Sequence, residues 1–512
     1  MIKGSDMNNK WLFFLNKYAL GLLFVALYFL STDDMDYFDF GVRLKLGFVF
    51  FLFVFVGGVA FYGGRVFFGR MEKIKLYYFD VPAFVWIFLC VVACVYNGGG
   101  KNYAYTFAAI LFFLSVQSSR LDFFCKNRIR IAKYMVISGI VLSFLGWGQF
   151  VASIAGMGKP FYVQQWWYDN LIPRINGLLY EPSYYSLVMS FFVIFSFSAL
   201  GVGKKEKFFR KSLTVLFFVS SVALVISSSR TGVLAVAFFI PILIVYKYVF
   251  FNGLGVKGSF KLFAFFVGFS VLFFMTVGVS VNYLSHDIKR NYADSETNYS
   301  AAVKKEETKP QETKAEETKA EETKAEETKA EETKAEETKA EETKAEETNS
   351  NVYHQSVFAG TGLYGESNHS LAPRVESFFN TLEVARKNLL FGVGLGGISL
   401  NIAKINGEEN LSSEKLREYE GLSPLIEMVA ATGIIGGFAF SSWFLCSVVV
   451  EGKVFVRNET SLDSILKKSL CLSLLFQFFL MQVNQNILRE YFWVNFFMTM
   501  IFIFNRKKDN NG

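Results

Sequence analysis

Long, uninterrupted runs of apolar residues dominate the chain, and they constrain its fold more than any other feature. A run of about 18–20 such residues crosses a hydrocarbon core of about 30 Å as a helix. In lipid the backbone has no outside hydrogen-bond partner, so each run must be helical. Twelve runs are predicted to span the membrane: 11–30, 44–62, 80–96, 102–118, 132–156, 184–202, 212–229, 231–251, 262–283, 424–450, 466–484 and 490–505. The sequence therefore predicts an all-α, polytopic integral membrane protein.

Basic residues alternate from loop to loop along the predicted spans, and this alternation gives the orientation. Loops that face the cytoplasm are enriched in Lys and Arg. The enriched segments are 65–75, 120–133, 204–211, 247–261, 453–468 and 506–508. Loop 31–41 instead contains four Asp and no Lys or Arg. We expect a multi-pass protein with both termini in the cytoplasm, with membrane lipids around it and no nucleic-acid partner.

The predicted organisation has three parts. Residues 1–283 form a membrane domain with nine spans, 284–422 an outer loop before span ten, and 423–512 the last three spans and a cytoplasmic tail. Within the loop, 304–348 is a low-complexity tract in which Lys-Ala-Glu-Glu-Thr occurs seven times in tandem from 314 to 348. The repeat has no apolar side chain larger than Ala and cannot build a core, so we interpret it as a disordered spacer.

The end of the outer loop has a helical pattern. Apolar residues recur every three or four positions, which predicts an amphipathic helix over 373–390 that lies along the outer membrane surface. The glycine-rich segment 391–397 follows it, and we expect a flexible turn beside lipid there rather than a phosphate-binding loop. Gly433 and Gly436 in span ten are expected to permit close helix packing.

Three arginines stand at predicted membrane boundaries on the outer side. Arg230 separates two spans, Arg174 begins the sequence Arg-x-x-Gly-x-x-x-Glu-Pro, and Arg374 begins the amphipathic helix. An ionisable residue at such a place is costly and is a candidate functional residue. A single one is usually an anchor. Three from distant segments favour a diphosphate head group on a polyprenyl lipid, because the planar guanidinium grips phosphate oxygens with two hydrogen bonds.

Glycosyl transfer from such a lipid would need few further groups. Cations beside the departing diphosphate stabilise the transition state, a catalytic role for Arg230. Glu181 is a candidate base for the acceptor hydroxyl, with pairing to an arginine or capping of the next span as alternatives. Trp166, Trp167 and Tyr168 are candidate sugar-stacking residues, with an interfacial aromatic belt as the alternative. The three histidines lack metal-ligand spacing, so no metal or other cofactor is expected.

These motifs resemble the O-antigen polymerase/ligase superfamily (Wzy and WaaL). The resemblance rests on the predicted spans, the large loop before span ten, and the motifs Arg174–Gly177 with Glu181-Pro182, Ser229–Gly232, and Arg374 followed by Leu390–Gly394. It implies a metal-independent, inverting glycosyltransferase with a GT-C-like fold. Such an enzyme acts on undecaprenyl-diphosphate-linked oligosaccharide at the periplasmic face of the bacterial inner membrane, with a chain-length regulator as a partner to consider. It further implies that the three arginines bind the diphosphate.

One departure from the family pattern favours a polymerase. Ligases have a His-Asn or His-Ser pair nine residues before Gly-x-x-Gly, whereas Leu422-Ser423 stands there in this chain. Glu427 is a weak candidate to replace the histidine. We therefore expect an O-antigen or surface polysaccharide polymerase that transfers the lipid-linked glycan onto the non-reducing end of a lipid-linked repeat unit. A ligase-type transferase of the same superfamily and a lipid-linked oligosaccharide flippase are the alternatives. Transporters usually carry polar groups near the midplane, whereas the charges here gather at the ends of the spans.

Overall fold

The computed structural model describes part of the chain. The described residues are 38–39, 43–44, 78–120, 122–155, 166–168, 172–179, 181–200, 206–251, 256–277, 372–408, 416, 419, 421–456, 461–483 and 486–504. The predicted spans 11–30 and 44–62, the latter apart from Leu44, and the repeat tract 304–348 lie outside them. The chain divides into two compact units, Met1–Val281 with Ser377–Gly512 in one and Asn282–Glu376 in the other.

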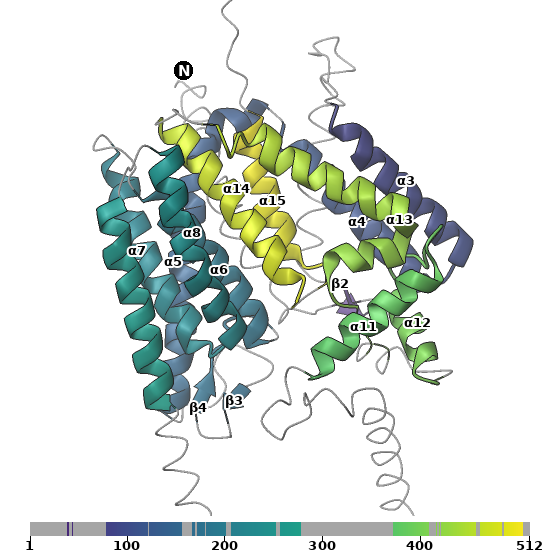
Figure 1. Ribbon diagram of the computed structural model, residues 1–512, viewed down its shortest axis with the longest axis horizontal. Coiled ribbons are helices and arrows are strands. Elements are labelled where there is room, and N and C mark those ends of the chain that lie inside the picture. The colour runs from purple at the N-terminus through teal and green to yellow at the C-terminus, as the bar shows by residue number, and fades with distance from the viewer. Residues whose placement is uncertain are drawn as a thin grey trace, which may run out of the picture. The chain divides into compact units, whose positions relative to one another are not determined.

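Helices make up most of the described structure (Figure 1). They are α3 (Asp80–Asn97), α4 (Gly100–Ser118), α5 (Asp122–Ile154), α6 (Pro182–Ala199), α7 (Lys207–Ile226), α8 (Arg230–Phe250), an unlabelled helix Val256–Val277, α11 (Ala372–Lys387), α12 (Ile398–Ile405), α13 (Pro424–Leu445) continued by the π-helix η2 (Cys446–Glu451), α14 (Leu462–Met481) and α15 (Glu490–Ile503). Two short antiparallel pairs join β1 (Phe38–Asp39) to β2 (Arg43–Leu44) and β3 (Trp166–Tyr168) to β4 (Ile172–Arg174).

Eight helices within the described ranges are long and apolar enough to cross a membrane. They are α3, Phe124–Ile154 of α5, α6, α7, α8, Val256–Val277, Pro424–Glu451 and α14. This agrees with the predicted all-α membrane protein. Helices α4 and α15 match two further predicted spans, but α15 has 14 residues. At about 1.5 Å per residue it is shorter than a core of about 30 Å. The count of twelve and the GT-C-like fold stay predictions.

Helix α6 lies at the centre of one group of helices. Every residue in it except Tyr184 is buried, and it packs against α5, α7, α8 and α14. The serines in its middle and at its end satisfy their hydroxyl groups on the helix itself: Ser190 donates to the carbonyl of Leu187 at 2.9 Å, and Ser196 to that of Phe192 at 2.7 Å. A hydroxyl that is bonded one turn back within its own helix adds no unmet polar group to an apolar interior.

A second group contains α3, α4, α13 and α15, and α14 connects it to the first by packing against both α6 and α15. Stacked indole rings form its centre: Trp86 of α3 lies 5.7 Å from Trp443 of α13 and 6.2 Å from Trp493 of α15, between ring centroids. Phe112 of α4 stacks on Trp493 at 5.1 Å. Aromatic contacts of this kind contribute about 0.5–1.5 kcal/mol each beyond simple burial.

Helix α13 is broken inside the bundle at Gly433, where φ is 74° and ψ is 176°. The break releases the backbone N–H of Ile434, which donates to the carbonyl of Leu389 at 2.8 Å. It also frees the carbonyl groups of Ala430 and Ala431. Because lipid cannot satisfy these groups, a broken span is stable only where other parts of the protein pair with it. Gly433 is therefore the site of a backbone break rather than of the close helix packing that the sequence predicted.

The glycine turn 391–397 provides the missing partners. The N–H groups of Val393 and Gly394 donate to the carbonyls of Ala430 and Ala431, both at 2.9 Å. A Cβ at Gly392 would lie 2.3 Å from the carbonyl carbon of Ala431, so the backbone can approach only because no side chain intervenes. Apart from Phe391 the turn is buried. The expectation of a flexible turn beside lipid is thus wrong: this is a packed turn whose amides are committed to α13.

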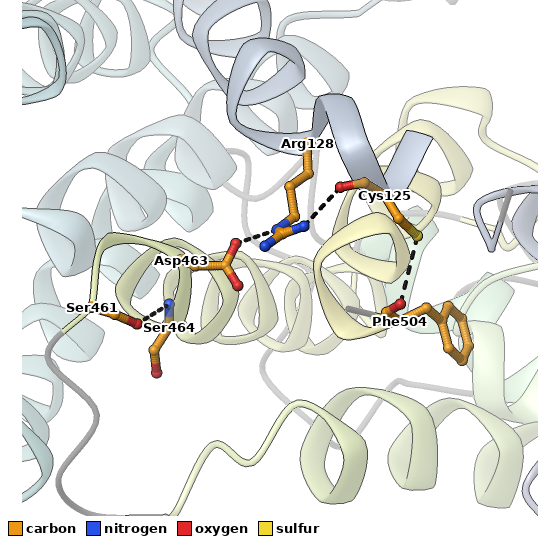
Figure 2. A network of polar contacts seen from close by, with 6 residues as sticks. All are labelled: Cys125, Arg128, Ser461, Asp463, Ser464 and Phe504. Carbon is orange, nitrogen blue, oxygen red and sulfur yellow. Dashed lines mark hydrogen bonds and ion pairs between the residues drawn. The ribbon is translucent and has the colours of Figure 1, made fainter. Parts of the chain in front are cut away.

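Ion pairs join the helix ends that are expected to face the cytoplasm. Figure 2 shows Arg128 of α5 in an ion pair with Asp463 at the start of α14, while it also donates to the carbonyl of Cys125 at 2.8 Å. The thiol of Cys125 is 3.6 Å from the carbonyl oxygen of Phe504, just after α15. Nearby, Arg120 forms a two-point ion pair with the buried carboxylate of Asp80. Side chains thus fasten α3, α4, α5, α14 and α15 at one end.

We expect Gly433→Ala to lower the free energy of unfolding by about 3 kcal/mol. The new Cβ would lie 2.2 Å from the carbonyl oxygen of Leu390, at a φ that only glycine adopts readily. Thermal unfolding of the purified protein in detergent measures the effect. Gly148→Ala in α5 is the matched control, since no atom lies within 4 Å of the added methyl group. Equal melting temperatures for the two variants would contradict the packed-turn interpretation.

Arg120→Ala should destabilise the protein by about 3–5 kcal/mol, the usual cost of removing one partner of a buried ion pair. Asp80 is 1% exposed and would lose the guanidinium that compensates its charge. The control is Arg386→Ala, because Arg386 is 74% exposed in its pair with Glu383 and its removal should leave stability unchanged. Unfolding in mixed detergent and dodecyl sulfate micelles compares the two variants, and similar losses for both would refute the prediction.

Candidate functional site

The first turn of α6 organises the candidate site. Glu181 precedes the helix in extended backbone geometry, and its carbonyl accepts hydrogen bonds from the N–H groups of Tyr184 and Tyr185 at 3.1 and 3.2 Å. Pro182 starts the helix with a fixed φ and without needing a donor partner. The hydroxyl of Ser183 donates to Glu181 Oε2 at 2.6 Å. The half-buried Glu181 carboxylate is therefore fixed at the end of a buried helix.

The segment that leads into α6 begins as a short β-hairpin. Trp166 pairs with Arg174 in register, at the ends of β3 and β4. Sequence reasoning did not predict these strands. Arg174 is half-buried at the end of β4, and the side chains of Trp166, Trp167 and Tyr168 lie outside the described residues. The proposed stacking of these three rings on sugars stays a prediction.

Asn176 and Gly177, just after Arg174, are tied to α5 by one side chain. Gln149 Oε1 accepts from the backbone N–H groups of Asn176 at 3.1 Å and Gly177 at 2.8 Å, while Gln149 Nε2 donates to Asn176 Oδ1 at 2.5 Å. Gln149 lies in α5, whereas Asn176 and Gly177 lie in the connection between β4 and α6. The side chains of Gln149 and Asn176 are both buried. A Cβ at Gly177 would lie 2.6 Å from the ring of Tyr185. The Asn-Gly part of the motif thus fixes the loop that follows Arg174.

Arg230 is the first residue of α8 and is exposed. The preceding Ser229 is buried, and its hydroxyl is hydrogen-bonded to that of Ser186 at 2.9 Å. Ser186 lies in α6, one turn beyond Ser183, whose carbonyl accepts from the Ser186 hydroxyl at 2.7 Å. The start of α8 is therefore attached to the same end of α6 that follows Glu181.

Sequence reasoning missed Arg489, which reaches the same turn of α6 from another helix. It immediately precedes α15, donates from Nη2 to the hydroxyl oxygen of Tyr184 at 2.9 Å, and its Cζ lies 4.3 Å from the Tyr184 ring centroid. The sequence contained a signal for it, because Arg489 stands in a short turn between two apolar runs, as Arg230 does.

Glu427, the candidate substitute for the ligase histidine, has a different task. Its Oε2 accepts from the backbone N–H of Ile487 at 2.8 Å, and its side chain is buried. Gln482, like Ile487, lies in the turn between α14 and α15. Its Oε1 accepts from the hydroxyl of Ser423 at 2.8 Å and from the N–H of Leu425 at 3.2 Å. Glu427 thus helps to fasten the α14–α15 turn to the start of α13.

Arg374 lies in α11, which confirms a helix in the predicted segment 373–390. The residue is half-buried and belongs to the unit Asn282–Glu376, apart from the unit that holds Arg174 and Arg230. Later residues of α11 belong to the larger unit: Thr381 Oγ1 accepts from the N–H of Leu422 at 3.1 Å. The larger unit therefore gathers elements that carry Arg174, Glu181, Arg230 and Arg489, while Arg374 stays a sequence prediction.

Two further findings bear on the site. Across the described part of the chain, no group of three or more His, Cys, Asp or Glu is placed to hold a metal ion. No family model, curated protein or solved structure matches the chain.

Gln149→Leu should loosen the connection between β4 and α6. The substitution removes the acceptor of the Asn176 and Gly177 amides, so these should exchange with deuterium at least about tenfold faster, the effect of losing roughly 1.4 kcal/mol of protection. Hydrogen exchange read by mass spectrometry on peptides that cover 172–179 measures this. Gln117→Leu in α4 is the control and should leave these peptides unchanged. Unaltered exchange in the Gln149 variant would show that the loop is braced by other contacts.

Proposed function

We propose that this protein is an O-antigen or surface polysaccharide polymerase. It transfers an undecaprenyl-diphosphate-linked glycan onto the non-reducing end of a lipid-linked repeat unit at the periplasmic face of the bacterial inner membrane. The observation that carries the proposal is the arrangement about the first turn of α6. A fixed carboxylate, Glu181, begins the turn, the Ser229-Arg230 start of α8 is hydrogen-bonded to it through Ser186, and Arg174 ends the strand that leads into it.

The proposed reaction needs one carboxylate and several cations. The acceptor hydroxyl oxygen forms a bond to the anomeric carbon of the donor sugar, and its proton passes to the Glu181 carboxylate. The bond between the anomeric carbon and the diphosphate oxygen breaks with its electron pair, and polyprenyl diphosphate departs. Attack from the side opposite the leaving group inverts the anomeric configuration. No other oxidant, reductant or activated group is required.

Arginine suits the departing diphosphate for two reasons. Its guanidinium stays charged at all physiological pH values, and its planar donors match pairs of phosphate oxygens. In the proposal Arg230 and Arg174 bind the diphosphate and stabilise the negative charge that grows on it, with Arg374 as a third binding residue. Arg230 is exposed at a helix start, where the positive end of the helix dipole adds to its attraction for an anion.

A ligase-type transferase is less well supported. The position of the ligase histidine holds Leu422, whose N–H donates to Thr381, and the hydroxyl of the adjacent Ser423 donates to Gln482. Neither residue offers an imidazole that could take a proton, and both are committed to packing the start of α13. The polymerase is therefore the proposal we retain.

Gel analysis of surface glycans tests the proposal. A deletion strain should carry one repeat unit per anchor, and the wild-type protein should restore the ladder of long chains. Arg174→Ala and Arg230→Ala should each lower the yield of long chains by about 100–1,000-fold, the usual effect of removing one preorganised donor from a developing anion. Arg386→Ala, at an exposed arginine paired with Glu383, is the matched control and should restore the full ladder.

Three outcomes would reject the proposal. Long polymer that is not attached to its final acceptor in the deletion strain would indicate a ligase, and absence of any repeat at the cell surface would indicate a flippase. A normal ladder from an Arg230→Ala protein that is present at the wild-type level would show that this guanidinium does not bind the diphosphate.

A further inference from the structure

Arg489 occupies a position that helix stability alone does not favour. It is the N-cap of α15, makes no side-chain cap, and is 9% exposed. Good N-cap residues accept a hydrogen bond from the first N–H groups of the helix, which arginine cannot do. Its charge has the same sign as the positive end of the helix dipole. Its guanidinium donates a hydrogen bond to the hydroxyl of Tyr184 of α6 and stacks on the ring of that residue.

The turn that carries Arg489 is fixed to α13 and to α15, the helix that it precedes. Ile487 donates its N–H to Glu427 of α13, and its carbonyl accepts from Trp493 Nε1 of α15, both at 2.8 Å. Gln482 is bonded to Ser423 at 2.8 Å. The backbone around Arg489 is therefore held in place by hydrogen bonds. Through its guanidinium, this fixed turn also contacts α6.

Tyr184 receives this contact at the turn that matters for the proposed chemistry. Its N–H donates to the carbonyl of Glu181, and it is the one residue of α6 that is not fully buried. Ser186, which bonds the start of α8, lies two residues further on, about 200° around the helix. The first turn of α6 is thus gripped from two directions, by Arg489 on one side and Ser229 on another.

We propose that Arg489 is a positioning residue for glycosyl transfer, an inference that rests on the proposed function. It fixes the first turn of α6 so that the Glu181 carboxylate keeps its place relative to the diphosphate-binding Arg230. A displacement of about 1 Å between reacting groups can slow a reaction about 100-fold, while binding of the lipid-linked substrate through other contacts is unchanged. The effect of losing Arg489 should therefore appear in kcat and not in KM.

The experiment uses the full-length protein in liposomes with lipid-linked repeat units purified from the deletion strain. Arg489→Gln should lower kcat by about 10–100-fold and leave KM within about twofold. Arg489→Lys, which keeps the charge, should recover part of the loss. Tyr184→Phe removes the hydroxyl acceptor and keeps the ring, so it should lower kcat by a smaller factor.

A double-mutant cycle separates positioning through Tyr184 from a general loss of structure. If Arg489 acts through Tyr184, the double variant Arg489→Gln/Tyr184→Phe should be no slower than Arg489→Gln alone. Multiplied effects, a raised KM with wild-type kcat, or wild-type kinetics in Arg489→Gln would each overturn the inference. Should Arg489→Gln fail to fold, Tyr184→Phe decides alone, and wild-type kcat in that variant overturns it. A wild-type protein that makes no polymer overturns the proposed function and this inference with it.

Discussion

Lipid offers no hydrogen-bond partner, and this constraint governs the structure. Two polar features within the described spans show how partners inside the protein replace water. The break at Gly433 is paired with the turn 391–397, and the buried Lys247 near the end of α8 donates to the carbonyls of Phe197 and Leu200 at the end of α6. A lysine placed on the last carbonyls of a helix satisfies those groups and meets the negative end of the helix dipole.

The arginines of the bundle lie near the ends of the helices, and their surroundings differ between the two ends. At one end of the bundle, Arg120 and Arg128 are each matched by an aspartate, Asp80 and Asp463. At the other end, Arg489 donates to the Tyr184 hydroxyl and stacks on its ring, and Arg230 is exposed beside a serine pair. An arginine stays charged at all physiological pH values and can bind an incoming anion. The exposed position of Arg230, at the end of the bundle that holds the first turn of α6, supports the proposed binding of a diphosphate there.

Hydrophobic runs were enough to predict the helical membrane fold, because the length and composition of a span are local properties. They were also enough to identify Arg174, Glu181 and Arg230 as residues near span boundaries. They did not predict the pairing of turn 391–397 with α13, since that depends on two backbones separated along the chain meeting at the same place. Arg489 could have been recognised from its place between two apolar runs, but its contact with Tyr184, 305 residues away, could not, because no sequence spacing reports such a contact.

The motif Arg174–Gly177 shows why a motif match and a site are different things. Asn176 and Gly177 have structural tasks: the amide of Asn176 binds Gln149, and Gly177 makes room for Tyr185. Any protein that needs this loop against a helix would use them, whatever its activity. Arg174 and Glu181 lie at the two ends of the same segment, and they are the residues to which the proposed function assigns chemistry. The residues between these two ends determine how far apart Arg174 and Glu181 lie.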